Sequence, residues 1–426
     1  MQFNDMPLAA PILRAVSECG YTAPTPVQAR SIPEAIDGRD LLASAQTGTG
    51  KTAAFMLPVL QRLSTLRKGP KGAPRVLVLT PTRELAAQVT DATRNYGKYL
   101  RVRSTVILGG SPYGPQFRDL SRPIDLVVGT PGRLIDHLER GSLDLSRLEV
   151  LILDEADRML DMGFKEDVEK ITGAAPSDRQ TLLFTATLDR TMASLARRLL
   201  NDPVRIDIAG KQITHDHIGQ RLYVADDLGH KKRLLQHLVA AQELKRAIIF
   251  SATKRDADRL ARELNAEGHR AAALHGDMNQ GARNRTVRHL RSGRIRLLVA
   301  TDVAARGLDV PAISHVINFD LPMAAEDYVH RIGRTGRAGA SGSAISFAAG
   351  DDAIRLERIE RYIGRQIDRE QIDGLEPTRP LRSPRRNQGN RKKPGGYSRK
   401  FASRRKEPVI EYRKRKPKRA AAPKAR

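Results

Sequence analysis

Short apolar runs alternate with stretches of helical length, and this alternation occurs twice along the 426-residue chain. Helical stretches such as residues 83–98 and 254–267 separate the apolar runs. Continuous apolar strands alternating with helices predict parallel sheets covered on both faces. The first series of candidate strands comprises residues 41–44, 76–80, 106–108, 126–128, 150–153 and 181–184. The second series comprises residues 247–250, 271–274, 297–301, 316–319 and 344–347.

Two such series predict two α/β domains, with a break near residues 208–218. There Gly210 and Lys211 interrupt the pattern, followed by His215 and His217. A closed metal site needs about four ligands, and no further ligand cluster accompanies these histidines, so we interpret the segment as a solvated linker. The expected organisation is a first domain over 1–208, a linker over 209–217, a second domain over 218–370 and a tail over 371–426.

The positive charge of the chain is concentrated at its C-terminal end. The net charge is +26, and residues 377–426 contribute +18 of it, with 20 Lys and Arg against Glu407 and Glu411. Pro, Gly and Ser are frequent there and large apolar residues are few, which predicts a disordered basic arm. An excess of this size indicates a polyanionic partner, most simply nucleic acid.

Other features of the composition exclude whole classes of protein. No run approaches 18 apolar residues, so we expect no membrane span. The N-terminus carries Asp5 and Glu18 and has no basic-then-apolar order, so we expect no signal peptide. The single cysteine, Cys19, cannot form an internal disulfide or a thiolate metal site, which fits a reducing, cytoplasmic location.

A glycine-rich segment follows the first candidate strand and precedes a helical stretch. Its glycines let backbone N–H groups close around phosphates, and the helix that follows presents its positive N-terminus to the same anions. Lys51 can reach the β- and γ-phosphates, and the Thr52 hydroxyl can ligate Mg²⁺. The segment reads Ala45, Gln46, Thr47, Gly48, Thr49, Gly50, Lys51 and Thr52, and begins with Ala where the generic phosphate loop has Gly.

A group of acidic residues follows the apolar strand at 150–153. The sequence there is Asp154-Glu155-Ala156-Asp157. Carboxylates at the carboxyl end of a strand lie where α/β sheets bind ligands. We expect Asp154 to hold Mg²⁺, directly or through water, and Glu155 to orient and polarise the attacking water.

Asp-Glu-Ala-Asp is the signature of the DEAD-box family of superfamily 2 ATP-dependent RNA helicases, and the chain resembles that family over residues 3–347. Residues 20–28 resemble the Q motif, with Phe3 as the isolated upstream aromatic and Tyr21 where the family usually has Phe. The resemblance implies that Gln28 pairs with the adenine edge, so that ATP is preferred to GTP. Thr185 and Thr187 lie in a Thr-Ala-Thr segment that resembles the family's Ser-Ala-Thr coupling motif.

Three strand-to-helix turns should lie on one edge of the first sheet. They offer backbone N–H groups, hydroxyls and an arginine, which suit phosphate oxygens rather than base edges. By similarity they are the family's RNA-backbone motifs, which predicts little sequence specificity. The residues concerned are Pro81, Thr82, Arg83, Gly109, Gly110, Thr130, Pro131, Gly132 and Arg133.

The second series also resembles the family. Residues 248–253 resemble motif IV, and residues 275–280 resemble an RNA-contact segment that includes Gly276. Residues 300–309, with Thr301 and Asp309, resemble motif V, and the resemblance places Asp309 at the nucleotide. Residues 330–337 resemble motif VI, whose Arg334 and Arg337 would stabilise charge on the transferring phosphoryl group.

The resemblance implies two tandem RecA-like parallel-sheet domains followed by a disordered basic tail, closest to the bacterial RhlE-type branch. The implied function is an RNA-dependent ATPase that uses ATP and Mg²⁺, closes its lobes on RNA, and separates short duplexes or remodels RNA–protein complexes. Two alternatives remain open: an ATP-gated RNA clamp, scaffold or chaperone with little unwinding, and a DNA-directed motor. RNA preference rests on the family, since no residue proves 2′-hydroxyl recognition.

Overall fold

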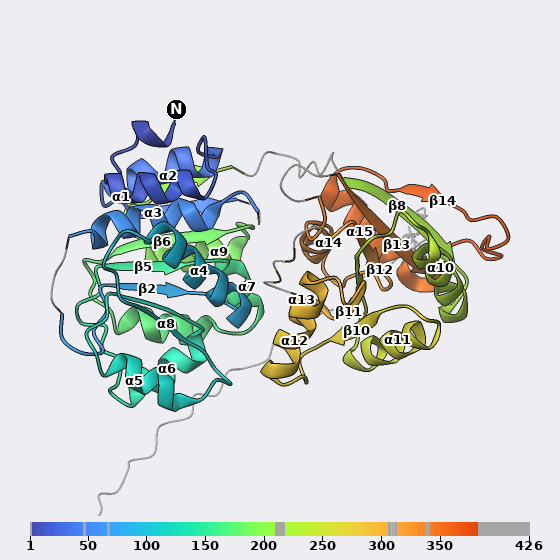
Figure 1. The fold of residues 1–426 in the computed structure, drawn as a ribbon. Helices are drawn as coiled ribbons and strands as arrows, with labels where there is room; N and C mark the ends of the chain where they lie inside the picture. The colour runs from blue at the N-terminus through green and yellow to red at the C-terminus, as the bar shows by residue number, and fades with distance from the viewer. Residues whose placement is uncertain are drawn as a thin grey trace, which may run out of the picture. The chain divides into compact units, whose positions relative to one another are not determined.

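The computed structural model describes residues 2–45, 48–65, 69–208, 218–305, 308, 310, 313–336 and 341–381. The described residues form two seven-stranded sheets, and every strand pairing within them is parallel. We refer to residues 2–208 as the first lobe and to residues 218–381 as the second lobe. Helices lie on both sides of each sheet (Figure 1).

The first sheet has the strand order β3-β4-β2-β5-β6-β1-β7. Its strands are β1 (Leu41–Ser44), β2 (Val76–Leu79), β3 (Ser104–Ile107), β4 (Leu126–Gly129), β5 (Val150–Leu153), β6 (Gln180–Thr185) and β7 (Val204–Asp207). Its helices are α1 (Ala10–Glu18), α2 (Pro26–Ile36), α3 (Lys51–Leu63), α4 (Arg83–Tyr96), α5 (Tyr113–Leu120), α6 (Pro131–Glu139), α7 (Ala156–Asp161), α8 (Lys165–Gly173) and α9 (Arg190–Leu199), after a short 3₁₀ turn at Phe3–Asp5.

The second sheet repeats this topology as β10-β11-β9-β12-β13-β8-β14. Its strands are β8 (Ile218–Ala225), β9 (Ala247–Phe250), β10 (Ala271–Leu274), β11 (Leu297–Ala300), β12 (His315–Asn318), β13 (Gly342–Ala349) and β14 (Asp368–Glu370). Its helices are α10 (Leu228–Ala240), α11 (Lys254–Ala266), α12 (Gln280–Arg291), α13 (Asp302–Ala305), α14 (Ala325–Ile332) and α15 (Ala353–Ile363).

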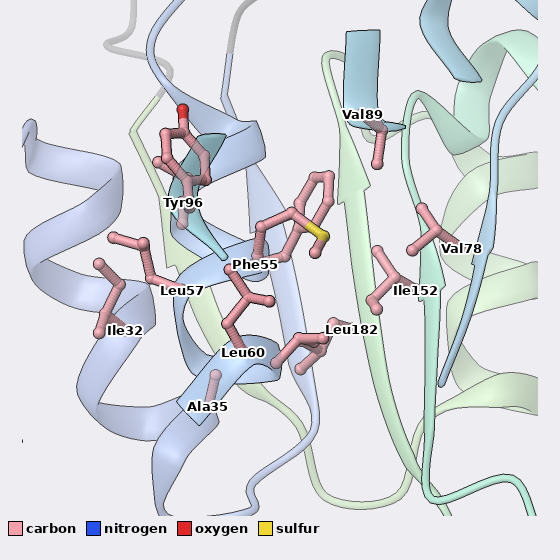
Figure 2. Close-up of a cluster of buried hydrophobic side chains, with 14 of the residues drawn as sticks. Ile32, Ala35, Phe55, Leu57, Leu60, Val78, Val89, Tyr96, Ile152 and Leu182 are labelled. Atoms are coloured by element: carbon pink, nitrogen blue, oxygen red, sulfur yellow. The ribbon is translucent and has the colours of Figure 1, made fainter. Parts of the chain in front are cut away.

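The two faces of the first sheet bury different side chains. On β2, Val78 packs in the cluster formed with α1 to α4, whereas Leu77 and Leu79 pack in the cluster formed with α5 to α9. Figure 2 shows the first of these clusters, in which Val78 and Ile152 lie near Phe55 of α3. The inner strands β2, β4 and β5 are continuously apolar because they are covered on both faces. The prediction of parallel sheets covered on both faces is therefore confirmed.

Three strands were not predicted from the sequence: β7, β8 and β14. Polar residues interrupt all three, and β7 and β14 lie at the ends of their sheet orders. Buried and exposed residues alternate in β7 and over most of β8. A search for continuous apolar runs misses such strands, because at the margin of a sheet only one face is buried.

The packed body extends beyond the expected start of the tail at residue 371. Leu375 accepts a hydrogen bond through its carbonyl from Nε2 of His230 on α10, at 2.9 Å. Asp226 accepts from the backbone N–H groups of Thr378 and Arg379 at 3.0 and 2.8 Å. Residues 371–381 therefore belong to the second lobe, and the boundary at 370 is too early. The expected linker at 209–217 and the chain from 382 onward lie outside the described residues.

Candidate nucleotide and RNA site

The glycine-rich segment forms the turn between β1 and α3. Gly48 and Gly50 both have φ of +89°, a conformation that L side chains rarely adopt, so glycine is required at both positions. Lys51 begins α3, and its Nζ donates to the carbonyl of Ala45 at 2.8 Å. Thr49 lies between the glycines and Thr52 follows Lys51, whereas Gln46 and Thr47 lie outside the described residues. The turn thus places one buried ammonium over the end of β1.

Gln28 connects the Q-motif segment to this turn. Its side chain is buried, its Nε2 donates to the carbonyl of Gly50 at 3.1 Å, and its Oε1 accepts from the N–H of Thr25 at 3.0 Å. A side chain at residue 50 would collide with the Gln28 amide. Each end of the amide keeps capacity for one further hydrogen bond, because Nε2 carries two protons and Oε1 two lone pairs. Tyr21 begins the same loop and is 40% exposed.

Asp154 and Glu155 lie directly after β5, where the sheet's carboxyl edge brings them beside the glycine-rich turn. Asp154 is buried, and its Oδ1 has no hydrogen-bond partner among the described residues. Burial raises the pKa of Asp154 to about 7, with Lys51 lowering it and Glu155 raising it. An orphaned buried carboxylate oxygen fits a cation ligand, and Mg²⁺ is typically held by one or two protein oxygens and several waters.

Glu155 has a left-handed backbone, with φ of 52°, which is uncommon for a residue other than glycine. Burial favours the neutral acid, but the charges of Arg158, Lys51 and Arg334 outweigh it and hold the pKa of Glu155 below its ordinary value. Nη1 of Arg158 lies 3.2 Å from Oε2 of Glu155. Glu155 is therefore an ionised, buried carboxylate held in a strained backbone conformation, and such strain clusters at functional sites.

Asp157, to which the sequence reading gave no role, connects the acidic group to the Thr-Ala-Thr segment. Its Oδ2 accepts from the N–H groups of Ala186 and Thr187, both at 3.0 Å, and from the Thr187 hydroxyl at 3.2 Å. The Thr185 hydroxyl donates to the carbonyl of Thr187 at 2.7 Å. The role of Asp157 follows from strand order. Because β5 and β6 are parallel neighbours, the acidic group after β5 lies beside the Thr-Ala-Thr segment after β6.

The three turns that the sequence assigned to RNA lie together at the carboxyl edge of the first sheet. They line a cavity of about 640 Å³ with residues of the second lobe. Arg83 donates to Oε1 of Gln280 at 2.9 Å, and Glu84 accepts from Arg283 at 2.7 Å. The predicted residues in the lining are Pro81, Thr82, Arg83, Gly109, Gly110, Thr130, Gly132, Arg133 and Gly276. Pro131 and Thr301 are absent from the lining.

Arg133 has partners of its own within the first lobe. It is buried, its Nη1 donates to the carbonyl of Ser111 at 2.9 Å, and its guanidinium lies 3.9 Å from the centre of the Tyr113 ring. These contacts join the turn after β4 to the turn after β3. Arg133 thus holds two turns together, while Arg83 packs against Gly110, where any side chain would collide with it.

Two arginines of the motif VI segment, Arg331 and Arg334, have different partners. Arg331 is bidentate to Asp302, at 2.6 and 2.7 Å, and so joins α14 to α13. Arg334 is buried, and its Nη1 donates to the carbonyl of Leu308 at 2.9 Å. Its charge acts on the Glu155 carboxyl of the first lobe. Asp309 and Arg337 lie outside the described residues.

The described residues contain no group of three or more His, Cys, Asp or Glu side chains able to hold a metal ion. None of the helices in the described part of the chain is long and apolar enough to cross a membrane. Cys19 is a free, exposed thiol.

Two parallel sheets of the same topology, with a glycine-rich turn and strand-end acids on the first, define a tandem RecA-like protein. The chain matches the family described as DEAD/DEAH box helicase over residues 25–195 and the helicase conserved C-terminal domain over residues 230–339. It is 46% identical to the ATP-dependent RNA helicase SrmB of Escherichia coli, over 88% of this chain and 85% of that one. It is 43% identical to the DEAD-box ATP-dependent RNA helicase CshA of Bacillus cereus, over 86% and 69%.

Among solved structures, the chain is similar to S. cerevisiae Dbp5 bound to RNA and ADP BeF₃. The TM-score is 0.79 at 32% identity, and the match covers 87% of this chain and 95% of that one. The chain belongs to the DEAD-box family of ATP-dependent RNA helicases. The relatives above are named SrmB and CshA, so the placement in the RhlE-type branch stays a prediction.

We predict that Asp157→Asn lowers the free energy of unfolding of the chain by about 1.5–3 kcal/mol, the range for hydrogen bonds to a charged group. The amide cannot accept all three bonds with the strength of a carboxylate. Chemical denaturation monitored by circular dichroism measures the change. Asp91→Asn is the matched control, because the Asp91 side chain is 71% exposed and pairs with the exposed Arg94. Equal effects of the two substitutions would contradict the prediction.

Proposed function

We propose that this protein is an RNA-dependent ATPase that closes its lobes on RNA and separates short RNA duplexes or remodels RNA–protein complexes. One observation carries the proposal. The Glu155 carboxyl is buried with Nη1 of Arg158 3.2 Å from its Oε2, and the charges of Lys51 from the first lobe and Arg334 from the second also lower its pKa. A hydrolytic site divided between the lobes is complete only when the lobes come together. Residues of both lobes also line the cavity that we propose binds RNA, which supports this mechanism.

In this proposal the first lobe binds the nucleotide. Lys51 and the backbone of residues 45–50 hold the phosphates. Thr52 and Asp154 would hold Mg²⁺, which would neutralise charge on the β- and γ-phosphates. The orphaned Oδ1 of Asp154 supports a cation at this point. Tyr21 and Gln28 bind the adenine base, and Asp309 of the second lobe completes the nucleotide set. Base recognition through the Gln28 amide would leave polar groups unpaired with guanine.

Glu155 orients and polarises the attacking water, because its lowered pKa keeps it able to accept a hydrogen bond. Arg334 and Arg337 stabilise the charge that develops on the transferring phosphoryl group. Arg334 is supported by its influence on Glu155, and Arg337 by its place three residues later in the motif. Thr185 and Thr187 couple the site to the RNA side, and the Asp157 bonds to Ala186 and Thr187 supply a physical connection for that coupling.

RNA binds across the turns of the first lobe and the segment around Gly276 and Thr301. The proposed contacts are to sugars and phosphates, which gives little sequence specificity. Arg83 and Gly110 line the cavity directly. Arg133 is better suited to positioning two turns than to a phosphate contact, because Ser111 and Tyr113 already engage its guanidinium.

Two other functions compete with this one. An ATP-gated RNA clamp, scaffold or chaperone would hold RNA without unwinding it. The set Lys51, Asp154, Glu155 and Arg334 supports turnover instead, because a clamp needs no ionised water-orienting carboxylate. A DNA-directed motor is the other alternative. The RNA bound to the similar Dbp5 structure favours RNA. Ribonucleoprotein partners and a cytoplasmic location belong to the same proposal.

We predict that Glu155→Gln binds ATP and RNA with nearly unchanged affinity but loses steady-state ATP hydrolysis and strand separation. The amide matches the carboxylate in size but cannot orient water as a charged acceptor. The measurement is displacement of one strand from a short RNA duplex, with ATP and with a non-hydrolysable analogue. Glu166→Gln on the exposed start of α8 is the control. Strand displacement by Glu155→Gln at the rate of the unmodified chain would contradict the assignment.

The basic segment beyond residue 381 is proposed to tether RNA beside the lobes, with lysines and arginines on phosphates and Tyr397, Phe401 and Tyr412 on bases. A chain ending at residue 381 keeps the contacts of Thr378 and Arg379 with Asp226. We predict that its kcat stays nearly intact, because the motifs end at Arg337. The RNA concentration for half-maximal stimulation should rise.

The salt dependence of RNA binding separates tethering from a passive tail. A plot of log affinity against log salt concentration has a negative slope, whose magnitude grows by ~0.7 for each contact with a single-stranded phosphate. If about five tail residues make such contacts, the slope of the chain ending at residue 381 should be smaller in magnitude by roughly 3.5 than that of the full chain. Fluorescence anisotropy with labelled single-stranded RNA over a salt series measures it for both chains. Two parallel lines of equal affinity would show that the segment does not touch RNA.

A further inference from the structure

A pair of tyrosines joins the Q-motif loop to the helix that begins at the RNA side of the first lobe. The hydroxyl oxygens of Tyr21 and Tyr96 lie 2.9 Å apart, at hydrogen-bonding distance. Tyr21 is in the loop between α1 and α2, and Tyr96 is the last residue of α4. The usual family residue at position 21 is phenylalanine, which has no hydroxyl.

The two rings differ in exposure. Tyr96 is 6% exposed and belongs to the buried cluster of the first lobe, whereas Tyr21 is 40% exposed. In Figure 2 the Tyr96 hydroxyl is directed away from Leu60, toward the margin of the cluster. Burial, followed by the bond to Tyr21, raises the pKa of Tyr96. A buried, neutral phenol thus forms a hydrogen bond with an exposed one.

The Tyr21 ring has few other restraints. Phe3 stacks at 6.3 Å between ring centroids, with an interplanar angle of 24°. The loop enters through Gly20, whose φ of +78° a side chain rarely adopts. At its other end the loop is fixed by Gln28, which bonds to Thr25 and to Gly50 of the glycine-rich turn. The loop therefore has two anchors, one at the phosphate side and one at Tyr96.

We propose that Tyr96 is a positioning residue for adenine: its hydroxyl fixes the plane of the Tyr21 ring on which the base stacks. This inference rests on the proposed function, in which Tyr21 and Gln28 bind the base. A stacking partner must have a defined plane, and the stacking contact with the Phe3 ring includes no hydrogen bond that would fix that plane. The hydrogen bond to Tyr96 restricts the Tyr21 ring before the base binds. Less side-chain entropy is then lost on binding, which is the benefit of preorganisation.

The experiment uses the full chain and four variants: Tyr96→Phe, Tyr21→Phe, the double variant, and Tyr99→Phe as control. Tyr99 bonds to Glu18 on the exposed surface, so its substitution removes a tyrosine hydroxyl near α4 without touching the pair. The readouts are KM and kcat for ATP at saturating single-stranded RNA, KM for UTP, and the melting temperature.

We expect Tyr96→Phe to raise the KM for ATP by about three- to tenfold, the size of one neutral hydrogen bond, with kcat within about twofold. The KM for UTP of Tyr96→Phe should hardly change, and neither should the KM for ATP of Tyr99→Phe. Tyr21→Phe should lower the melting temperature, because it leaves the buried Tyr96 hydroxyl without its partner, and the double variant should recover it. The KM of the double variant for ATP should stay raised. This separates a positioning role from a purely structural one.

An unchanged KM for ATP in Tyr96→Phe would overturn the inference, as would a KM that recovers with the melting temperature in the double variant. An equal rise for UTP would overturn it too, because the effect would not be on the base. Failure of the proposed function gives a different result: the unmodified chain would then hydrolyse ATP and UTP equally well.

Discussion

The site depends on one constraint, that the strands of each sheet run in the same direction. A parallel sheet puts the carboxyl ends of its strands at one edge, so the turns after β1, β2, β3, β4, β5 and β6 all meet there. For this reason the glycine-rich turn, the acidic group and the turns proposed to bind RNA are far apart in sequence but lie at the same edge of the sheet. The second sheet repeats the strand order, and its motif V follows β11 in the same way.

At this edge the charges of the site balance one another. Burial alone would neutralise both acids, and it does raise the pKa of Asp154. Glu155 stays ionised because three cations outweigh its desolvation, and one of them, Arg334, comes from the second lobe. Opposite charge favours the charged form of a buried carboxyl. The same groups that would bind phosphate therefore also set the ionisation of the residue that would orient water.

The sequence predicted what depends on local pattern and missed what depends on distant contacts. Apolar runs predicted most strands, and glycine spacing predicted the turn at Gly48 and Gly50. The bonds of Asp157 to the turn after β6 join residues about 30 positions apart, and Asp226 binds a segment more than 150 positions later. No local pattern encodes such pairs. Arg133 was expected at phosphate, but its partners Ser111 and Tyr113 are defined only once the turns meet.

We propose that RNA and both lobes together complete one hydrolytic site. The most direct measurement is the steady-state ATP hydrolysis rate of the full chain without nucleic acid, with single-stranded RNA, and with single-stranded DNA of the same sequence. We expect a low basal rate, strong stimulation by RNA and weak stimulation by DNA. A rate that is the same in all three conditions would contradict it.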